Sequence, residues 1–165
     1  MITAGALTAD AAGAMTLDTS VDSADLSTSA AGSISVDETD AITLTDVDTS
    51  NGAITITAGG AITATDVASS TDSDANDITL TGVGIAVTKI DSGSTAGDVV
   101  LDAGTGAITQ DATDDKDDVT ADSLTADAAT GIDLDTTVLS ADLSVSGTGS
   151  IVLDELNAIL SLIHI

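Results

Sequence analysis

Carboxylates are the side chains of this 165-residue chain whose types and spacing could do chemistry. They gather in two clusters, Asp72–Asp77 (sequence DSDAND) and Asp114–Asp118 (sequence DDKDD). Because carboxylate and amide oxygens are the ligands that Ca²⁺ prefers, both clusters are candidate calcium sites. The candidate ligands are Asp72, Asp74, Asn76, Asp77, Asp114, Asp115, Asp117 and Asp118.

The first cluster begins like the calcium loop of an EF-hand but departs from it at two positions. The sixth residue is Asp77 where the motif needs Gly, and the twelfth is Val83 where the motif has Glu. The nonapeptide repeat of calcium-binding β-rolls is also absent from the sequence. Diffuse screening of the carboxylates by salt is therefore the alternative to specific Ca²⁺ sites.

Catalysis is the second possibility that the carboxylates raise. Asp133 and Asp135 could be paired as a general acid and a general base. The sequence holds no Arg, no Cys and no aromatic residue, so it lacks the groups that commonly assist such a pair or form a platform for a sugar. We predict that the chain is not an enzyme, that it needs no cofactor other than possible Ca²⁺, and that these Asp residues lie on a solvated strand face.

The charge of the chain limits its partners. Asp and Glu number 28 against two Lys, which gives a formal net charge of −26. Such a charge excludes nucleic acid and anionic membrane surfaces as partners. No apolar run approaches the roughly 20 residues that span a bilayer, so we expect no membrane insertion, and no secretion signal is present.

Short strands must position these carboxylates. Apolar residues alternate with Thr or Asp in Ile42–Thr45, Ile54–Thr57, Ile78–Thr81 and Ile132–Asp135, the pattern of half-buried strands. Gly residues precede many of these runs, which indicates tight turns. The complete absence of Pro is consistent with central strands, because Pro cannot donate to a hydrogen-bond ladder.

A second pattern has a period of about 20 residues. Ile34 and Ile54 are 20 residues apart, Leu7 and Leu26 are 19 apart, and later spacings reach 25 between Val99 and Leu124. Such a unit fits one coil of a parallel β-solenoid, an all-β fold of about seven coils of 19–25 residues. Ile34 and Ile151 are predicted to point inward and Thr55 outward, and aligned pairs such as Asp18/Asp37 and Asp135/Asp154 are predicted to stack. A β-sandwich is the competing fold, but it usually carries a buried Trp or Tyr.

A longer repeat relates the two ends of the chain to each other. Residues 3–42 recur without a gap at residues 120–159, and 25 of the 40 aligned positions are identical. Repetition at a fixed offset is typical of array proteins, so we interpret residues 1–159 as one solenoid segment of a longer array. The repeat ends at the tail 160–165 (sequence LSLIHI), where Ser161 stands in place of the inward Leu44. This tail resembles the translation of a sequencing-library adaptor, so we predict that it is non-native, that the chain comes from an environmental contig, and that His164 is no ligand.

The Gly-x-Ile-x-Leu strands, the Ala-Asp-x-Leu turns and the segment Gly131–Thr136 (sequence GIDLDT) give the chain a resemblance to a known family. It resembles the repeat region of filamentous-haemagglutinin-like bacterial adhesins of the two-partner secretion type. The resemblance implies a right-handed parallel β-helix in the shaft of a large secreted surface protein, with a host or surface receptor contacted elsewhere in the parent. It therefore implies a rigid spacer on the extracellular side of the bacterial cell surface, whose direct partners are the adjacent coils of the parent.

Two other functions are open alternatives. A cation-binding surface repeat would use the candidate Ca²⁺ ligands named above. An ice-binding solenoid would use flat rows of Thr, for which the Thr-x-Thr pairs are candidates, although Asp at equivalent outward places interrupts a continuous Thr face. These pairs are Thr43/Thr45, Thr55/Thr57, Thr63/Thr65 and Thr79/Thr81.

Overall fold

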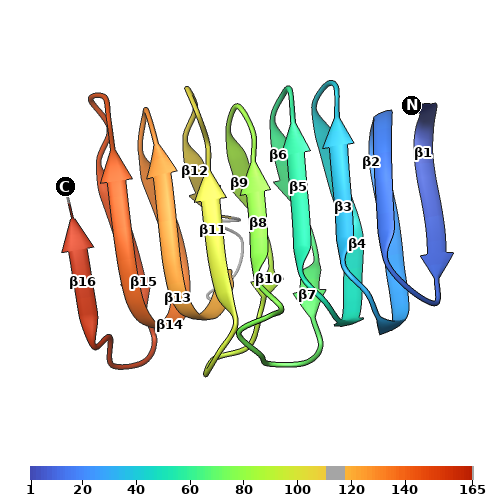
Figure 1. The fold of residues 1–165 in the computed structure, drawn as a ribbon. Coiled ribbons are helices and arrows are strands. Elements are labelled where there is room, and N and C mark those ends of the chain that lie inside the picture. Colours follow the sequence, from blue (N-terminus) through green and yellow to red (C-terminus); the bar gives the residue numbers. More distant parts are fainter. Residues whose placement is uncertain (111–117, 165) are drawn as a thin grey trace.

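The chain folds into a single stack of parallel β-strands (Figure 1). The computed structural model describes residues 1–110 and 118–164. Within these residues every strand pairing is parallel and no helix occurs, which confirms the predicted all-β solenoid. The strands are β1 (Ile2–Ala11), β2 (Met15–Ala31), β3 (Ile34–Glu38), β4 (Ile42–Asn51), β5 (Ile54–Ala58), β6 (Ile62–Ala64), β7 (Val67–Ser69), β8 (Ile78–Thr81), β9 (Ile85–Val87), β10 (Ile90–Asp91), β11 (Asp98–Asp102), β12 (Ile108–Gln110), β13 (Val119–Ala128), β14 (Ile132–Val145), β15 (Ile151–Glu155) and β16 (Ser161–His164).

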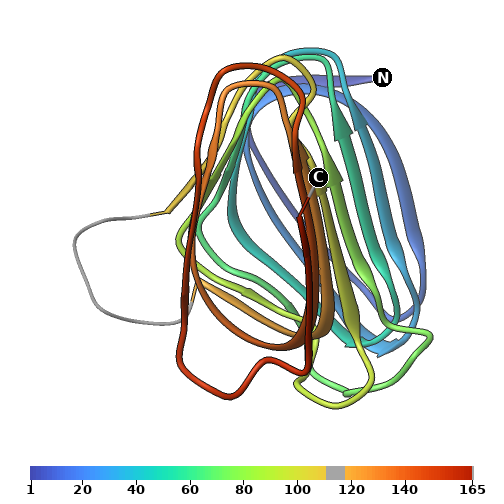
Figure 2. The ribbon, with the colours of Figure 1, turned by 90° about the vertical axis from the view of Figure 1, so that its left-hand side faces the viewer.

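Two rows of strands form the main walls of the solenoid, and the turns superpose when the stack is seen from its end (Figure 2). We call the first row face A. Its inward column of paired residues is Met15, Ile34, Ile54, Ile78, Val99, Leu124, Ala141 and Leu162. We call the second row face B. Its inward column is Ile42, Ile62, Ile85, Ile108, Ile132 and Ile151.

The interior of the stack is aliphatic, as the alternation predicts. In β5, Ile54 and Ile56 have no exposed surface, whereas Thr55 between them is exposed. Ile34 is also fully buried, which confirms its inward assignment. Ile151 points inward too, but it is only half-buried because no described turn covers the last strand of face B.

The stack has about eight turns, one more than the sequence predicts. The first turn is shorter than its Leu spacing suggested, because Leu7 pairs with Ala24 and not with Leu26. Leu124 likewise pairs with Ala141 and not with Leu143. The 19-residue alignment of these Leu residues is therefore wrong by two residues. In the actual register each Leu lies opposite an Ala, so large and small side chains alternate inside the turn.

Glycines at the corners allow the turns to stack closely. A Cβ atom on Gly52 would lie 2.3 Å from the carbonyl oxygen of Gly32 in the preceding turn. Gly131 has a φ of 141°, a conformation that L side chains rarely adopt. The glycines that the sequence shows before the strands are thus required by contact between backbones and by backbone conformation.

The two copies of the long repeat lie on different faces of the solenoid. Met15 pairs with Ile34, and their counterparts Ile132 and Ile151 pair in the same way. Met15, however, lies on face A, whereas Ile132 lies on face B. The repeat offset of 117 residues therefore equals a whole number of turns plus about half a turn. As a result, the same sequence forms a strand of face A in its first copy and a strand of face B in its second.

Candidate cation-binding sites

The loop before β8 holds the first predicted calcium cluster, but its members turn in different directions. Asp72 reaches the next turn, where its Oδ2 accepts hydrogen bonds from the Thr95 hydroxyl at 2.5 Å and the Thr95 N–H at 3.1 Å. Its Oδ1 accepts one from the Gly97 N–H at 3.2 Å. The bond from the Thr95 hydroxyl is the main cause that holds the pKa of Asp72 below its usual range. Asp72 is therefore a cap for the neighbouring loop.

The other three members of this cluster do not join Asp72 around one point. Asn76 is buried, and its amide nitrogen donates to Asn51 Oδ1 at 2.9 Å and to the Thr71 carbonyl at 2.8 Å. Asp77 accepts a hydrogen bond from the Asp98 N–H at 3.1 Å, and Asp74 is exposed. The loop thus bridges turns through capping bonds, and an EF-hand arrangement is not formed.

Asp98 at the start of β11 lies among carboxylates that come from neighbouring turns. Burial raises the pKa of Asp98 most, and the negative charges of Asp77 and Asp122 raise it further. Sequence reasoning missed Asp98 and Asp122 because neither belongs to a dense cluster. Their position became visible only once the register placed the turn of Asp77 next to theirs.

The second predicted cluster is described only at its last member. Asp114, Asp115 and Asp117 lie outside the described residues. Asp118 is buried, with 1% of its surface exposed, and its Oδ2 accepts a bond from the Asp135 N–H at 3.4 Å. With its amide nitrogen turned toward the carboxylates, Gln110 Nε2 lies 2.9 Å from Asp118 Oδ2 and 2.8 Å from Asp135 Oδ2. Asp118 therefore takes part in bonds between turns.

Acidic residues also stack along the axis, as the sequence predicts. Asp18 is paired with Asp37, and Asp135 with Asp154. Asp133, the other member of the pair considered for catalysis, is exposed. In residues 1–110 and 118–164, no three Asp, Glu or His side chains are grouped closely enough to hold a metal ion. Specific Ca²⁺ binding thus stays a prediction.

One cation of the chain itself sits among stacked carboxylates. Lys89 Nζ lies 2.9 Å from Asp66 Oδ1 and 3.2 Å from Asp66 Oδ2, and this contact raises the pKa of Lys89. Nearby, burial and then the Asp46 carboxylate raise the pKa of Asp48. The apolar residues Val47, Val67 and Ile90 stack on one another. Each is directly preceded by one of these charged residues, Asp46, Asp66 and Lys89 in turn, so the spacing of the apolar residues could have revealed the alignment.

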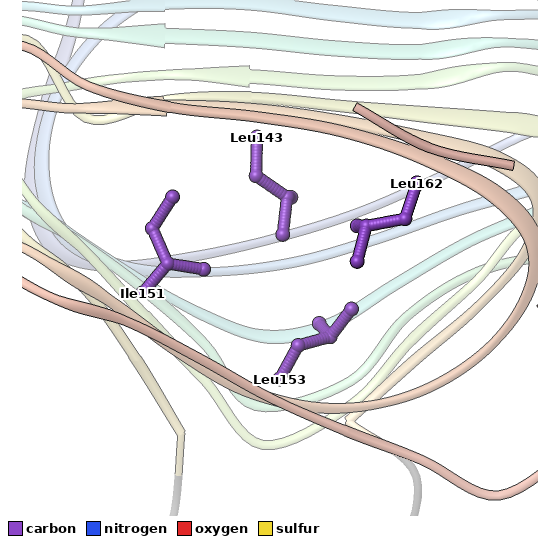
Figure 3. A pocket seen from close by; sticks show the side chains of 4 residues that line it. All are labelled: Leu143, Ile151, Leu153 and Leu162. Atoms are coloured by element: carbon purple, nitrogen blue, oxygen red, sulfur yellow. The ribbon is translucent and has the colours of Figure 1, made fainter. Parts of the chain in front are cut away.

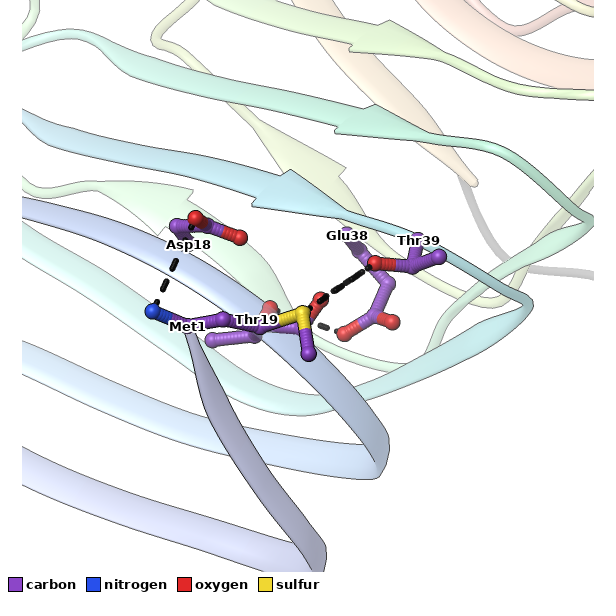
Figure 4. A network of polar contacts seen from close by, with 5 residues as sticks. All are labelled: Met1, Asp18, Thr19, Glu38 and Thr39. Atoms are coloured by element: carbon purple, nitrogen blue, oxygen red, sulfur yellow. Dashed lines mark hydrogen bonds and ion pairs between the residues drawn. The ribbon is translucent and has the colours of Figure 1, made fainter.

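Two glutamates, Glu38, which is buried, and Glu155, which is half-buried, bind donors of a neighbouring turn, and sequence reasoning missed both. Glu38 Oε2 accepts a hydrogen bond from the Thr19 hydroxyl at 2.8 Å (Figure 4). It also accepts one from the Val21 N–H at 3.0 Å, and Oε1 accepts one from the Asp40 N–H at 3.1 Å. Glu155 in the long repeat does the same, with bonds from Thr136, Val138 and Asn157 at 2.6, 3.2 and 3.2 Å. The recurrence of Asp-Glu at 37–38 and 154–155 was the available signal. We call each set a glutamate staple, because it ties one turn to the next.

The Thr-x-Thr pairs stack only in part. Thr55 is paired with Thr79, and Thr57 with Thr81, on face A. Beyond them the column that contains Thr57 continues as Asp37 on one side and Asp102 on the other. The full Thr-x-Thr array on this face is therefore two turns deep, and ice binding gains no support from it.

Two hollows of the described surface differ in place and lining. One on face B is lined by Asp22, Ala41, Ile42, Thr43, Ala61 and Thr63. Another, of about 280 Å³, opens at the C-terminal end of the stack and is lined by Leu143, Ile151, Leu153 and Leu162 (Figure 3). The side chains that line the second hollow are all aliphatic, so none of them offers a polar or titratable group.

Residues 160–164 of the tail contribute to this end. β16 pairs with β14, and Leu162 faces Ala141, whereas the repeat would place residue 161 there. A shift of one residue thus moves Ser161 out of the inward position and puts Leu162 in it. Whether the tail is native stays a prediction.

Comparisons with known proteins add no relative. No protein-family model matches the chain, and neither a curated protein nor a solved structure does. No helix long and apolar enough to cross a bilayer occurs in residues 1–110 and 118–164.

Proposed function

We propose that this chain is a structural repeat segment of a large secreted bacterial surface protein, in which it acts as a rigid spacer. The observation that carries the proposal is the unbroken column of face A, in which eight inward residues from Met15 to Leu162 follow one another turn by turn. A continuous stack of this kind holds its two ends at a fixed separation along one axis. The likeness of its strands and turns to the shafts of filamentous-haemagglutinin-like adhesins supports a place outside the cell, with any receptor contacted elsewhere in the parent.

Three features support rigidity. Parallel ladder bonds join each turn to the next, and close backbone contact at glycine corners such as Gly52 fixes their spacing. The glutamate staples of Glu38 and Glu155 add side-chain bonds between turns. The many outward carboxylates repel other acidic surfaces, so the walls favour a passive role.

A pair of spin labels tests the spacer role. Thr16 and Asp142 lie in one outward column of face A, six turns apart through Ser35, Thr55, Thr79, Val100 and Thr125. Because turns repeat at about 4.8 Å, the two Cα atoms should lie roughly 29 Å apart. The chain has no Cys, so Thr16→Cys and Asp142→Cys give two unique attachment points. We expect a narrow distance distribution near this value that is the same with Ca²⁺ and with a chelator. A broad distribution in both would refute a rigid spacer.

A calcium-loaded repeat is the alternative, and the raised pKa of Asp98 is the observation that favours it. Burial and the charges of Asp77 and Asp122 make the ionised form of Asp98 costly, and a bound cation would relieve that cost. Calcium titration followed by thermal unfolding separates the two functions. A stoichiometric rise in the melting temperature that Asp98→Asn abolishes would favour calcium loading. A gradual rise that NaCl reproduces at equal ionic strength would favour the passive spacer.

A further inference from the structure

One corner in the middle of the stack contains the only Asn-Gly pair of the chain, Asn51 and Gly52. Asn is a thermolabile residue, because the backbone nitrogen of the next residue can attack its side-chain amide. Gly as the next residue favours this attack, since it has no Cβ atom in the way. Asn51 is the last residue of β4 and is exposed, so water can reach the amide. The pair is therefore a candidate site of covalent modification.

The fold requires the glycine of this pair but not the asparagine. A Cβ atom on Gly52 would overlap the carbonyl oxygen of Gly32, which is a backbone atom and cannot turn away. In the preceding turn the same corner is formed by Ala31 and Gly32, since Ala31 is the residue paired with Asn51. Ala thus suits the backbone at this position, and the contacts of the Asn51 side chain are particular to its own turn.

The next turn covers this corner with the loop between β7 and β8. The Thr71 hydroxyl donates to the Ser50 carbonyl at 2.7 Å. Asn76, which is 1% exposed, donates from its amide nitrogen to Asn51 Oδ1 at 2.9 Å and to the Thr71 carbonyl at 2.8 Å. One buried side chain therefore ties the amide of Asn51 to the loop that lies over it.

We propose that Asn51 is a site of spontaneous deamidation and that Asn76 controls its rate. The Gly52 nitrogen loses its proton to hydroxide, bonds to Asn51 Cγ and displaces the side-chain nitrogen, which takes a proton from water and leaves as ammonia. A water molecule then opens the five-membered imide, so that aspartate or isoaspartate replaces Asn51. The ring holds Cγ, Cβ, Cα and the backbone carbonyl carbon of Asn51 close to one plane with the Gly52 nitrogen, which the extended backbone of a strand does not allow. Reaction thus requires this corner to open and the bond from Asn76 to break.

The two products affect the stack differently. Aspartate keeps the backbone and adds one negative charge. Isoaspartate routes the main chain through Cβ and Cγ of the former Asn51, which lengthens the corner where the Gly32 N–H donates to the Asn51 carbonyl at 2.9 Å. Deamidation would therefore loosen one turn of a regular wall. This inference goes beyond the spacer role and does not depend on it.

Variants at the two asparagines test the proposal. Asn76→Ala removes the bond to Asn51, and deamidation of the folded chain should become about fivefold faster, which corresponds to one hydrogen bond of average strength. Ala75→Ser is the matched control, because it changes the adjacent exposed residue of the same loop. Asn51→Ala removes the reacting amide and copies the corner of Ala31. Circular dichroism would verify folding, and Asn76→Asp, which keeps the shape of the side chain without its donor, is the second variant if Asn76→Ala does not fold.

Peptide mass spectrometry during incubation at mildly alkaline pH is the measurement, because hydroxide starts the reaction. Wild type unfolded in urea gives the unprotected rate, and Asn157, which is followed by Ala, is an internal reference. We expect Asn51 to react faster than Asn157 in the unfolded chain, and at least about tenfold slower in the folded chain, which must first open locally. Equal rates at Asn51 in the folded and unfolded wild type would overturn the proposal. So would a folded Asn76 variant that reacts no faster than the folded wild type.

Discussion

At the scale of single residues, polar groups of this chain act mainly between turns. Asp72, Asp118 and Glu38 each accept hydrogen bonds from residues of another turn. A carboxyl group suits this task because its two oxygens can satisfy several N–H and hydroxyl donors where the backbone changes direction. These acidic side chains therefore have a structural role at the corners of the turns. The Asp residues of the outward columns, by contrast, face solvent and are accessible to cations.

The glutamate staple gives the clearest prediction for one residue. Glu38→Ala removes the acceptor of the buried Thr19 hydroxyl, the Val21 N–H and the Asp40 N–H, and it leaves a cavity. We expect a loss of about 2–4 kcal/mol in the free energy of unfolding, measured by urea titration. Asp37→Ala, at the exposed neighbouring position, should change it by about 0.5 kcal/mol or less. Equal losses in the two variants would show that the staple does not hold the turns.

The contributions of Asp98 and Asp72 to the stability of the fold should change in opposite directions as pH falls. Asp98 has a raised pKa, so its protonation stabilises the fold, and this contribution grows as pH falls through the raised value toward the ordinary value of 3.8. Asp72 has a lowered pKa, so its ionised form stabilises the fold above 3.8, and this contribution is lost as pH falls through the lowered value. At pH 7 we therefore expect Asp98→Asn to raise the melting temperature and Asp72→Asn to lower it.

Thermal unfolding of both variants and the wild type across the acidic range would check this. The advantage of Asp98→Asn should vanish once the wild-type carboxyl group is protonated. A destabilising Asp98→Asn at pH 7 would contradict the assigned crowding of carboxylates around β11.

At the scale of strands, position within the stack determines what a side chain contributes. Ile34 and Ile151 are counterparts in the long repeat and both point inward, yet one has a turn on each side and the other lies in the last turn of its face. The pair is thus a natural control for the effect of coverage, because residue type and local sequence are nearly the same.

Alanine substitution at these two positions should give unequal effects. Ile34→Ala leaves a cavity in a fully buried site and should cost about 2–5 kcal/mol of unfolding free energy. Ile151→Ala should cost less than half as much, because its site is already open to the hollow of Figure 3. Similar losses measured by urea titration would mean that the last turn is covered in solution.

The strands and their spacing of about 20 residues could be predicted from the sequence. The pairing of residues between the first turns, and the face on which each copy of the long repeat lies, could not. Rows such as Ile34, Ile54 and Ile78 carry the period directly, because like aliphatic residues stack in this fold. Leu7 and Leu26 carry a false period, since each packs over an Ala two residues away from the expected partner. The half-turn shift of the long repeat depends on the summed lengths of all the turns between, so no local pattern reveals it.

For the candidate calcium site, the sequence predicted where acidic residues gather along the chain but not where their side chains point. The loop Asp72–Asp77 has calcium-like spacing, but spacing along the chain does not determine where side chains point once neighbouring turns offer N–H donors. Glu38 was visible as an inward position of the alternation that holds an acid, and its recurrence as Glu155 marked it as part of the unit.

At the scale of the whole molecule, the account depends on a fixed register between turns of unequal length. The turn from Ile54 to Ile78 takes 24 residues, yet Thr55 faces Thr79 as directly as residues do in shorter turns. Extra residues are accommodated in the loop before β8, so the walls stay regular. The spacer role requires this regularity.

Cross-linking of paired cysteines tests that register most directly. Thr55→Cys with Thr79→Cys places two outward residues opposite each other on adjacent strands, about 4.8 Å apart, within the Cα range of a disulfide. Thr55→Cys with Thr81→Cys is the control, shifted by two residues along β8, which moves the second Cα beyond the disulfide range. The chain has no other Cys to compete. Under mild oxidation of the folded monomer, the account predicts rapid intramolecular bonding in the first pair and little in the second. Faster bonding in the shifted pair, or equal bonding in both, would contradict the stacked register.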